Sequence, residues 1–121
     1  ELIIKLKREF KNKYTILIAP GPNEIDDSKE FNTRVILNKG ESLNIKMLIS
    51  LISNAKFVIS NDTGPAHIAS HLKKNGLALF GSHTSVKKVS IENENFRAIS
   101  VKDLSHLDVN TVMAKIKKRL N

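Results

Sequence analysis

Apolar residues along this chain follow two patterns, short continuous runs and stripes with helical spacing. The runs are short and are followed by turn-forming residues, which predicts buried strands over residues 14–19, 34–37, 56–60 and 77–80, the third of them with β-branched residues. A weaker alternation of apolar and polar residues predicts a last strand over residues 96–101. Residues 86–95 show no clear pattern.

Stripes with helical spacing lie before, between and after these strands. A helix is predicted over residues 1–13, with an apolar stripe of Leu2, Ile3, Leu6 and Phe10. A second helix is predicted after Asn44, which caps it, with an apolar stripe of Ile45, Leu48, Ile49 and Ile52. Asn54 is expected to end the second of these helices. A last helix, capped by Asp108 and rich in basic residues at its end, carries Val109, Val112, Met113, Ile116 and Leu120.

A short helix is predicted between the strands at residues 56–60 and 77–80. It begins at Gly64-Pro65, because proline suits the first helical turn, where its missing N–H costs nothing. One face of this helix carries Ala66, Ile68, Ala69 and Leu72. Lys73 and Lys74 are expected in the last turn, where cations complement the helix dipole, and Gly76 is expected to stop the helix. A strand–helix–strand unit this short requires a parallel strand pair with a right-handed crossover.

The alternation of strands and helices predicts an α/β fold, a Rossmann-like three-layer sandwich with a mostly parallel sheet. With 121 residues, 40% of them hydrophobic, the chain is large enough to form a single domain over residues 1–121. Open α/β sheets bind ligands at the loops that follow the carboxyl ends of their strands. Such loops lie at residues 20–27, 60–64 and 81–85, and we expect them to converge on one edge of the sheet.

The loop Asp62-Thr63-Gly64 is the strongest candidate for chemistry. It follows a strand and opens a helix, where backbone N–H groups and the positive end of the helix dipole favour anions, phosphate above all. Gly64 lacks a side chain where a phosphate would need to approach closely. Thr63 offers a hydroxyl, and His67 can face the same ligand from the first helical turn. In the structural alternative, Asp62 or Thr63 only caps the helix, Gly64 makes the turn and His67 is solvated.

The other two loops add further candidate groups. Glu24 can accept hydrogen bonds from two vicinal hydroxyls, although an acid in this place also suits a first helical turn. Ser82 and Thr84 follow the strand at residues 77–80 and can bind phosphate or sugar hydroxyls. Asp26 and Asp27 are expected to be surface charges, because no third metal ligand lies near them, so no metal site is predicted. The Walker lysine pattern and the dinucleotide fingerprint are both absent from the sequence.

Composition narrows the classes of function. The net charge of +8 invites a nucleic-acid interpretation, but the lysines are scattered and are not interleaved with aromatic residues, so no nucleic acid is expected as a partner. A solvated basic surface explains the charge better, with attraction to an anionic membrane as second choice. The chain has no cysteine, no apolar run that could span a bilayer and no visible signal peptide. It begins with Glu1, which is consistent with a fragment of a longer protein.

The segment Asp-Thr-Gly-Pro-Ala-His-Ile-Ala, with the strands on either side of it, resembles the signature of glycosyltransferase family 9, the heptosyltransferases. The resemblance extends over residues 14–84. It implies the carboxyl-terminal, donor-binding half of a two-domain GT-B fold and a nucleotide-diphosphate sugar, ADP-heptose in known members, as the substrate, without a cofactor or metal. By position in the family pattern, the candidate donor-binding residues are Glu24, Asp62, Thr63, Gly64, His67, Ser82 and Thr84, with Glu24 on the ribose and residues 39–43 beside the base.

The same resemblance puts the general base, an aspartate, in an amino-terminal domain, so no catalytic residue is expected in this chain. We expect the 121 residues alone to bind donor weakly and to transfer nothing. The resemblance also implies a lipid-linked glycan acceptor, such as a lipopolysaccharide core, and a cytoplasmic location at the inner face of the membrane. The alternatives are a stand-alone nucleotide-binding or interaction module without catalysis and, less favoured, a basic nucleic-acid-binding domain.

Overall fold

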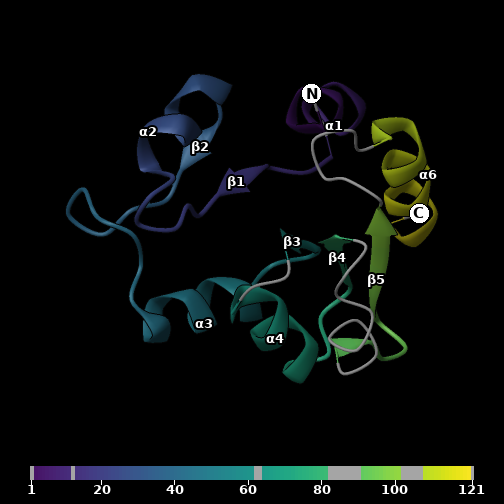
Figure 1. The fold of residues 1–121 in the computed structure, drawn as a ribbon. Helices are drawn as coiled ribbons and strands as arrows, with labels where there is room; N and C mark the ends of the chain where they lie inside the picture. Colours follow the sequence, from purple (N-terminus) through teal and green to yellow (C-terminus); the bar gives the residue numbers. More distant parts are fainter. Residues whose placement is uncertain (1, 12, 62–63, 82–90, 102–107, 121) are drawn as a thin grey trace. The chain divides into compact units, whose positions relative to one another are not determined.

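The computed structural model describes the chain apart from residues 1, 12, 62–63, 82–90, 102–107 and 121 (Figure 1). The chain divides into two compact units, Glu1–Leu48 and Ile49–Asn121. Both units contain parallel β-pairing, and both alternate strands with helices. The predicted α/β class is therefore confirmed, and the expectation of one domain over the whole chain stays a prediction.

The first unit holds helix α1 (Leu2–Glu9), strand β1 (Leu17–Ile18), helix α2 (Ile25–Ser28), the 3₁₀-helix η1 (Lys29–Phe31) and strand β2 (Arg34–Val35). The two strands pair in parallel, with Leu17 opposite Arg34. Both lie inside the predicted ranges but are only two residues long. The first helix ends at Glu9 and not at residue 13, and beyond it the carbonyl of Phe10 accepts the amides of Lys13 and Tyr14, at 3.0 and 3.1 Å.

A tight turn at Asn38–Glu41 follows β2. The amides of Asn38 and Glu41 each donate to the other residue's carbonyl oxygen, at 2.8 and 3.0 Å. Lys39 and Gly40 both have positive φ angles, 52° and 83°. That pair of angles is typical of a two-residue type I′ turn, so the turn-forming residues that follow the run at 34–37 do form a turn.

Helix α3 (Ile45–Ser53) runs across the boundary between the units. The predicted cap is confirmed, because the Asn44 side-chain oxygen accepts the amide of Met47 at 2.8 Å. Asn54 ends the helix as expected, with its side-chain amide donating to the carbonyl of Ser50 at 2.8 Å. The apolar stripe is only partly buried, since Ile52 is buried while Ile45 is 64% exposed.

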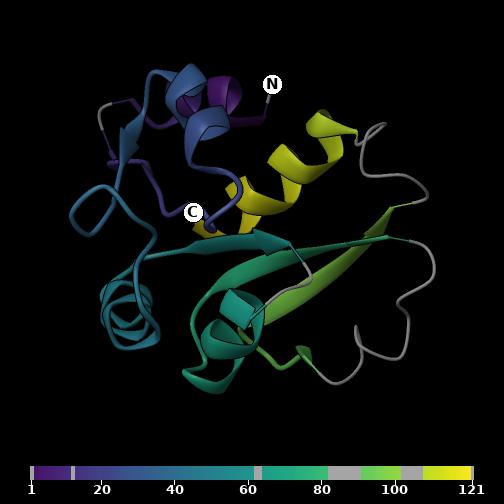
Figure 2. The same ribbon diagram turned by 60° about the vertical axis from the view of Figure 1, so that its left-hand side comes forward.

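The second unit is built on a three-stranded parallel sheet in the order β3 (Val58–Asn61), β4 (Gly76–Gly81), β5 (Phe96–Val101). Helix α4 (Gly64–His71) covers one face of this sheet, and helix α6 (Val109–Leu120) covers the other (Figure 2). The central strand is buried over residues 76–80 because it has helices on both sides. The three-layer arrangement and the strand predicted at residues 96–101 are thus confirmed in this unit.

The core of the second unit lies between the sheet and its helices. Its largest fully buried side chains are Phe80, Phe96, Leu77, Ile91, Ile116 and Val112. Ile91 belongs to the stretch in which the sequence showed no pattern. Met113, predicted as a core residue, is buried.

The end of α4 differs from the prediction. The helix stops at His71, and Lys73, not Gly76, adopts the left-handed conformation that closes it, with φ of 54°. The amide of Lys74 donates to the carbonyl of Ala69, and that of Lys73 donates to the carbonyl of Ser70, both at 3.0 Å. This is a Schellman motif. Lys73 and Lys74 therefore follow the helix and do not belong to its last turn.

Gly76 does not stop the helix, but it is required where β4 packs beside β3. It opens β4, where a Cβ atom would lie 2.3 Å from the carbonyl oxygen of Val58 and 2.9 Å from the ring of Phe96. Leu72, which was predicted on the apolar face of α4, is 40% exposed because it lies beyond the last helical residue.

Candidate functional site

The candidate site is built around the start of α4. Strand β3 ends at Asn61 and α4 begins at Gly64. Gly64 is exposed, and a Cβ atom built on it would meet no heavy atom of the described residues within 4 Å. Pro65 follows as the second helical residue, as the sequence predicted. The first amides of a helix have no partners within the helix, so this end can receive an anion from outside.

His67 lies on the outer side of α4. The helix packs through Ala66 and Ala69, both fully buried, whereas His67 is exposed. Because the buried alanines fix the orientation of α4, the helix presents the imidazole of His67 one turn from Gly64. His67 can therefore meet a ligand that approaches from solvent.

Parallel pairing places further candidates at the same edge. Asn61, the last residue of β3, lies opposite Leu79 of β4, and β4 ends two residues later at Gly81. The loops after these two strands therefore leave the same edge of the sheet at which α4 begins. Four of the candidate residues, Asp62, Thr63, Ser82 and Thr84, are in these loops and lie outside the described residues.

Glu24 belongs to the first unit, immediately before α2. Its amide donates to the carbonyl of Gly21 at 3.0 Å, and its own carbonyl accepts the amide of Ser28 at 3.0 Å. Its carboxylate makes no capping hydrogen bond to α2. One carboxylate oxygen lies 2.9 Å from the place that a Cβ of Gly21 would take, so the carboxylate folds back over this glycine. Glu24 is exposed and can accept hydrogen bonds from a ligand.

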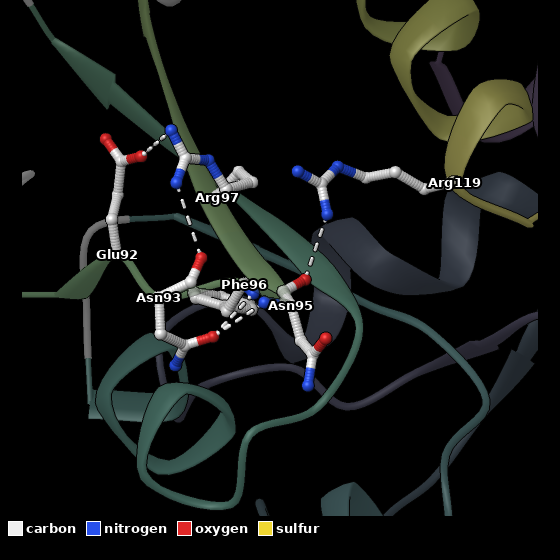
Figure 3. A network of polar contacts seen from close by, with 6 residues as sticks. All are labelled: Glu92, Asn93, Asn95, Phe96, Arg97 and Arg119. Atoms are coloured by element: carbon white, nitrogen blue, oxygen red, sulfur yellow. Dashed lines mark hydrogen bonds and ion pairs between the residues drawn. The ribbon is translucent and has the colours of Figure 1, made fainter.

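A polar network that the sequence did not predict lies at the amino-terminal end of β5 (Figure 3). The side-chain oxygen of Asn93 accepts the amides of Asn95 and Phe96, both at 2.9 Å. Arg97 forms an ion pair with Glu92 at 2.9 Å. Only tertiary structure brings these groups together, although an Asn shortly before a strand is a familiar turn signal.

Arg119 joins this network from α6. Its guanidinium donates to the carbonyl of Asn95 at 3.1 Å, and its own carbonyl accepts the side-chain amide of Asn75 at 3.1 Å. Burial lowers the pKa of Arg119 from its usual value, and the nearby positive charge of Arg97 lowers it further. The network fastens β5 to α6 at the edge opposite the start of α4, so its role is structural.

Comparison with known protein families shows to which family this chain belongs. The sequence model of glycosyltransferase family 9 (heptosyltransferase) matches residues 23–115. This chain belongs to glycosyltransferase family 9. In this family-9 chain the matched range includes every candidate donor-binding residue, from Glu24 to Thr84.

A solved structure supports the fold of this family-9 chain. The E. coli heptosyltransferase WaaC, determined with ADP, superposes with a TM-score of 0.79 at 22% sequence identity. The match covers 97% of this chain and 37% of the WaaC chain. The fold is therefore that of one part of a GT-B heptosyltransferase. A comparison with curated protein sequences finds no match.

Two kinds of feature are absent from the described residues. None of their helices has the length and apolar character needed to cross a membrane. They contain no group of three or more His, Cys, Asp or Glu residues arranged to hold a metal ion.

Proposed function

We propose that this chain is the donor-binding part of a heptosyltransferase-like glycosyltransferase, which transfers a sugar from a nucleotide-diphosphate sugar to a glycan acceptor. One observation carries the proposal: in a family-9 chain, the helix that opens with Gly64 begins at the end of a parallel sheet where such sheets bind their ligands, and a Cβ on Gly64 would meet none of the described residues within 4 Å. The related fold of WaaC was determined with ADP, which supports a nucleotide as the ligand.

ADP-heptose is the donor we propose. The diphosphate lies at the start of α4, where helix amides, Thr63 and His67 compensate its charge. Glu24 accepts hydrogen bonds from the ribose hydroxyls. Ser82 and Thr84 contact phosphate or sugar hydroxyls.

In the proposed transfer, an acceptor hydroxyl attacks the anomeric carbon of the donor sugar. The bond from that carbon to the diphosphate oxygen breaks, and the diphosphate leaves with the bonding electron pair. The start of α4 stabilises the negative charge that develops on the leaving diphosphate. The hydroxyl proton passes to a general base that we place in another domain of the enzyme. The acceptor is a lipid-linked glycan such as a lipopolysaccharide core, at the cytoplasmic face of the membrane.

Nucleotide titration followed by amide NMR tests this proposal. We expect ADP to shift the amides of Gly64, Ala66 and His67, and to bind better than UDP or GDP. Glu24→Ala and Asp62→Ala are each expected to weaken ADP binding at least tenfold, which is about 1.4 kcal/mol. Glu30→Ala is the matched control, because Glu30 is an exposed glutamate in the neighbouring η1 and is expected to leave the affinity unchanged.

Two results would contradict the proposal. One is a set of ADP-induced shifts that avoids the start of α4. The other is salt-sensitive binding of an oligonucleotide by a chain that binds none of the three nucleotides, which would favour a nucleic-acid-binding domain.

A further inference from the structure

Helix α4 carries a second histidine one turn after the first. His67 and His71 are four residues apart, and both are exposed. Side chains at this spacing lie on the same helical face, with their Cβ atoms about 5–6 Å apart. The two imidazoles are therefore neighbours on the outer surface of α4.

The geometry of α4 keeps this pair on the solvent side. Ala66 and Ala69, both fully buried, define the face that packs on the protein. At 3.6 residues per turn, the mean direction of the two histidines is on the order of 150° around the helix axis from those alanines. The helix stays regular to its end, because the amide of Leu72 donates to the carbonyl of Ile68 at 3.0 Å.

We propose that His67 and His71 form a binding site for a divalent transition-metal ion such as Zn²⁺, Ni²⁺ or Cu²⁺. Two histidines at this spacing on one helical face are a known zinc-binding arrangement, because both imidazoles reach one ion at about 2.0–2.1 Å. Imidazole nitrogen suits these ions, whereas Mg²⁺ and Ca²⁺ prefer oxygen ligands. Among the three, Cu²⁺ is expected to bind most tightly.

The surroundings make this an open site. The described residues contain no third His, Cys, Asp or Glu in ligating position, so they supply two protein ligands to the proposed site. Structural zinc sites use four protein ligands, and a site with two is weaker and exchanges its ion more readily. The cations Lys73 and Lys74 follow the pair and lower its affinity further. The proposal departs from the sequence-based expectation of no metal site, and it holds whether or not the chain binds a nucleotide.

Titration of the complete chain with Ni²⁺ or Cu²⁺, followed by calorimetry, tests the site. The variants are His67→Gln, His71→Gln and the double variant, all at exposed positions where the fold is expected to persist. We expect each single variant to bind at least tenfold more weakly than the native chain. The double variant is expected to bind the ion only slightly more weakly than either single variant, because removing one histidine already abolishes chelation by the pair.

A relocation variant keeps the number of histidines and changes only their geometry. In His71→Gln combined with Leu72→His, the second imidazole moves to the residue after the last helical one, five positions from His67, where it loses the four-residue spacing that makes side chains neighbours. This variant is expected to bind as weakly as the single ones. In the native chain, Zn²⁺ is expected to shift the imidazole NMR signals of His67 and His71 together.

Native affinity in either single variant, or in the relocation variant, would overturn the proposal. It would also be overturned if Zn²⁺ shifted the signals of His83 or His106 and left those of the α4 pair unchanged. Circular dichroism spectra of all variants exclude loss of fold as the cause of any weakened binding.

Discussion

At the scale of single residues, two glycines obey different constraints. A Cβ at Gly76 would collide with the backbone oxygen of Val58, so the packing of β3 against β4 requires glycine there. A Cβ at Gly64 would meet none of the described residues within 4 Å. The described part of the fold therefore does not require glycine at residue 64, and the proposed close approach of a phosphate gives it a reason.

Gly76→Ala is expected to lower the free energy of unfolding by roughly 3 kcal/mol, because backbone atoms cannot move aside as a flexible side chain can. Chemical denaturation measures the change, with Gly64→Ala as the control that is expected to be close to neutral. A loss below about 1 kcal/mol for Gly76→Ala would show that the sheet adjusts to the added methyl group.

Lys73→Gly is expected to stabilise the chain by about 1 kcal/mol, because a non-glycine residue is strained in the left-handed conformation that closes α4. Lys115→Gly, at an exposed position inside α6, is the matched control and is expected to destabilise by about 1 kcal/mol. If both changes destabilise equally, the end of α4 is not strained at Lys73.

At the scale of elements, the sequence predicted what local chemistry decides. The caps Asn44 and Asp108 were found correctly, because each side chain bonds amides a few residues along the chain. Strand lengths were less predictable, because a strand ends where its hydrogen-bonding to the neighbouring strand ends. For this reason β1 and β2 are shorter than their apolar runs. Gly76 was misassigned because Lys73 takes the conformation that glycine usually takes.

Asp108→Ala tests the cap of α6. The Asp108 carboxylate accepts the amides of Asn110 and Thr111, at 3.1 and 3.3 Å, and the Thr111 hydroxyl at 2.7 Å. Its removal is expected to cost about 1 kcal/mol of unfolding free energy, whereas Asp108→Asn, which can still accept the amides, is expected to cost less. Thermal denaturation compares the two, and equal losses would mean that the charge matters more than the amide bonds.

At the scale of the whole molecule, the sequence motif predicted the family and the fold class, and both are confirmed. The motif is informative because it joins a strand end, a helix start and the glycine proposed to bind the ligand in one local segment. The polar network around Asn93 and Arg119 was not predictable, because its partners come from separate turns and a helix. The roles of Glu24 and the loop residues in donor binding stay predictions.

The complete reaction is expected to need more than these 121 residues. Because the family resemblance places the general base elsewhere, this chain is expected to bind ADP-heptose without accelerating release of ADP in the presence of acceptor. A coupled assay for ADP measures this. Turnover by the chain alone would mean that one of its own residues acts as the base.

ADP affinity in Gly64→Ala tests the central claim most directly, because it separates binding from folding. The account predicts an unchanged melting temperature, since the new methyl group meets none of the described residues, together with at least tenfold weaker ADP binding. Native ADP affinity in a normally folded Gly64→Ala chain would contradict it, because the diphosphate would then not lie against the start of α4.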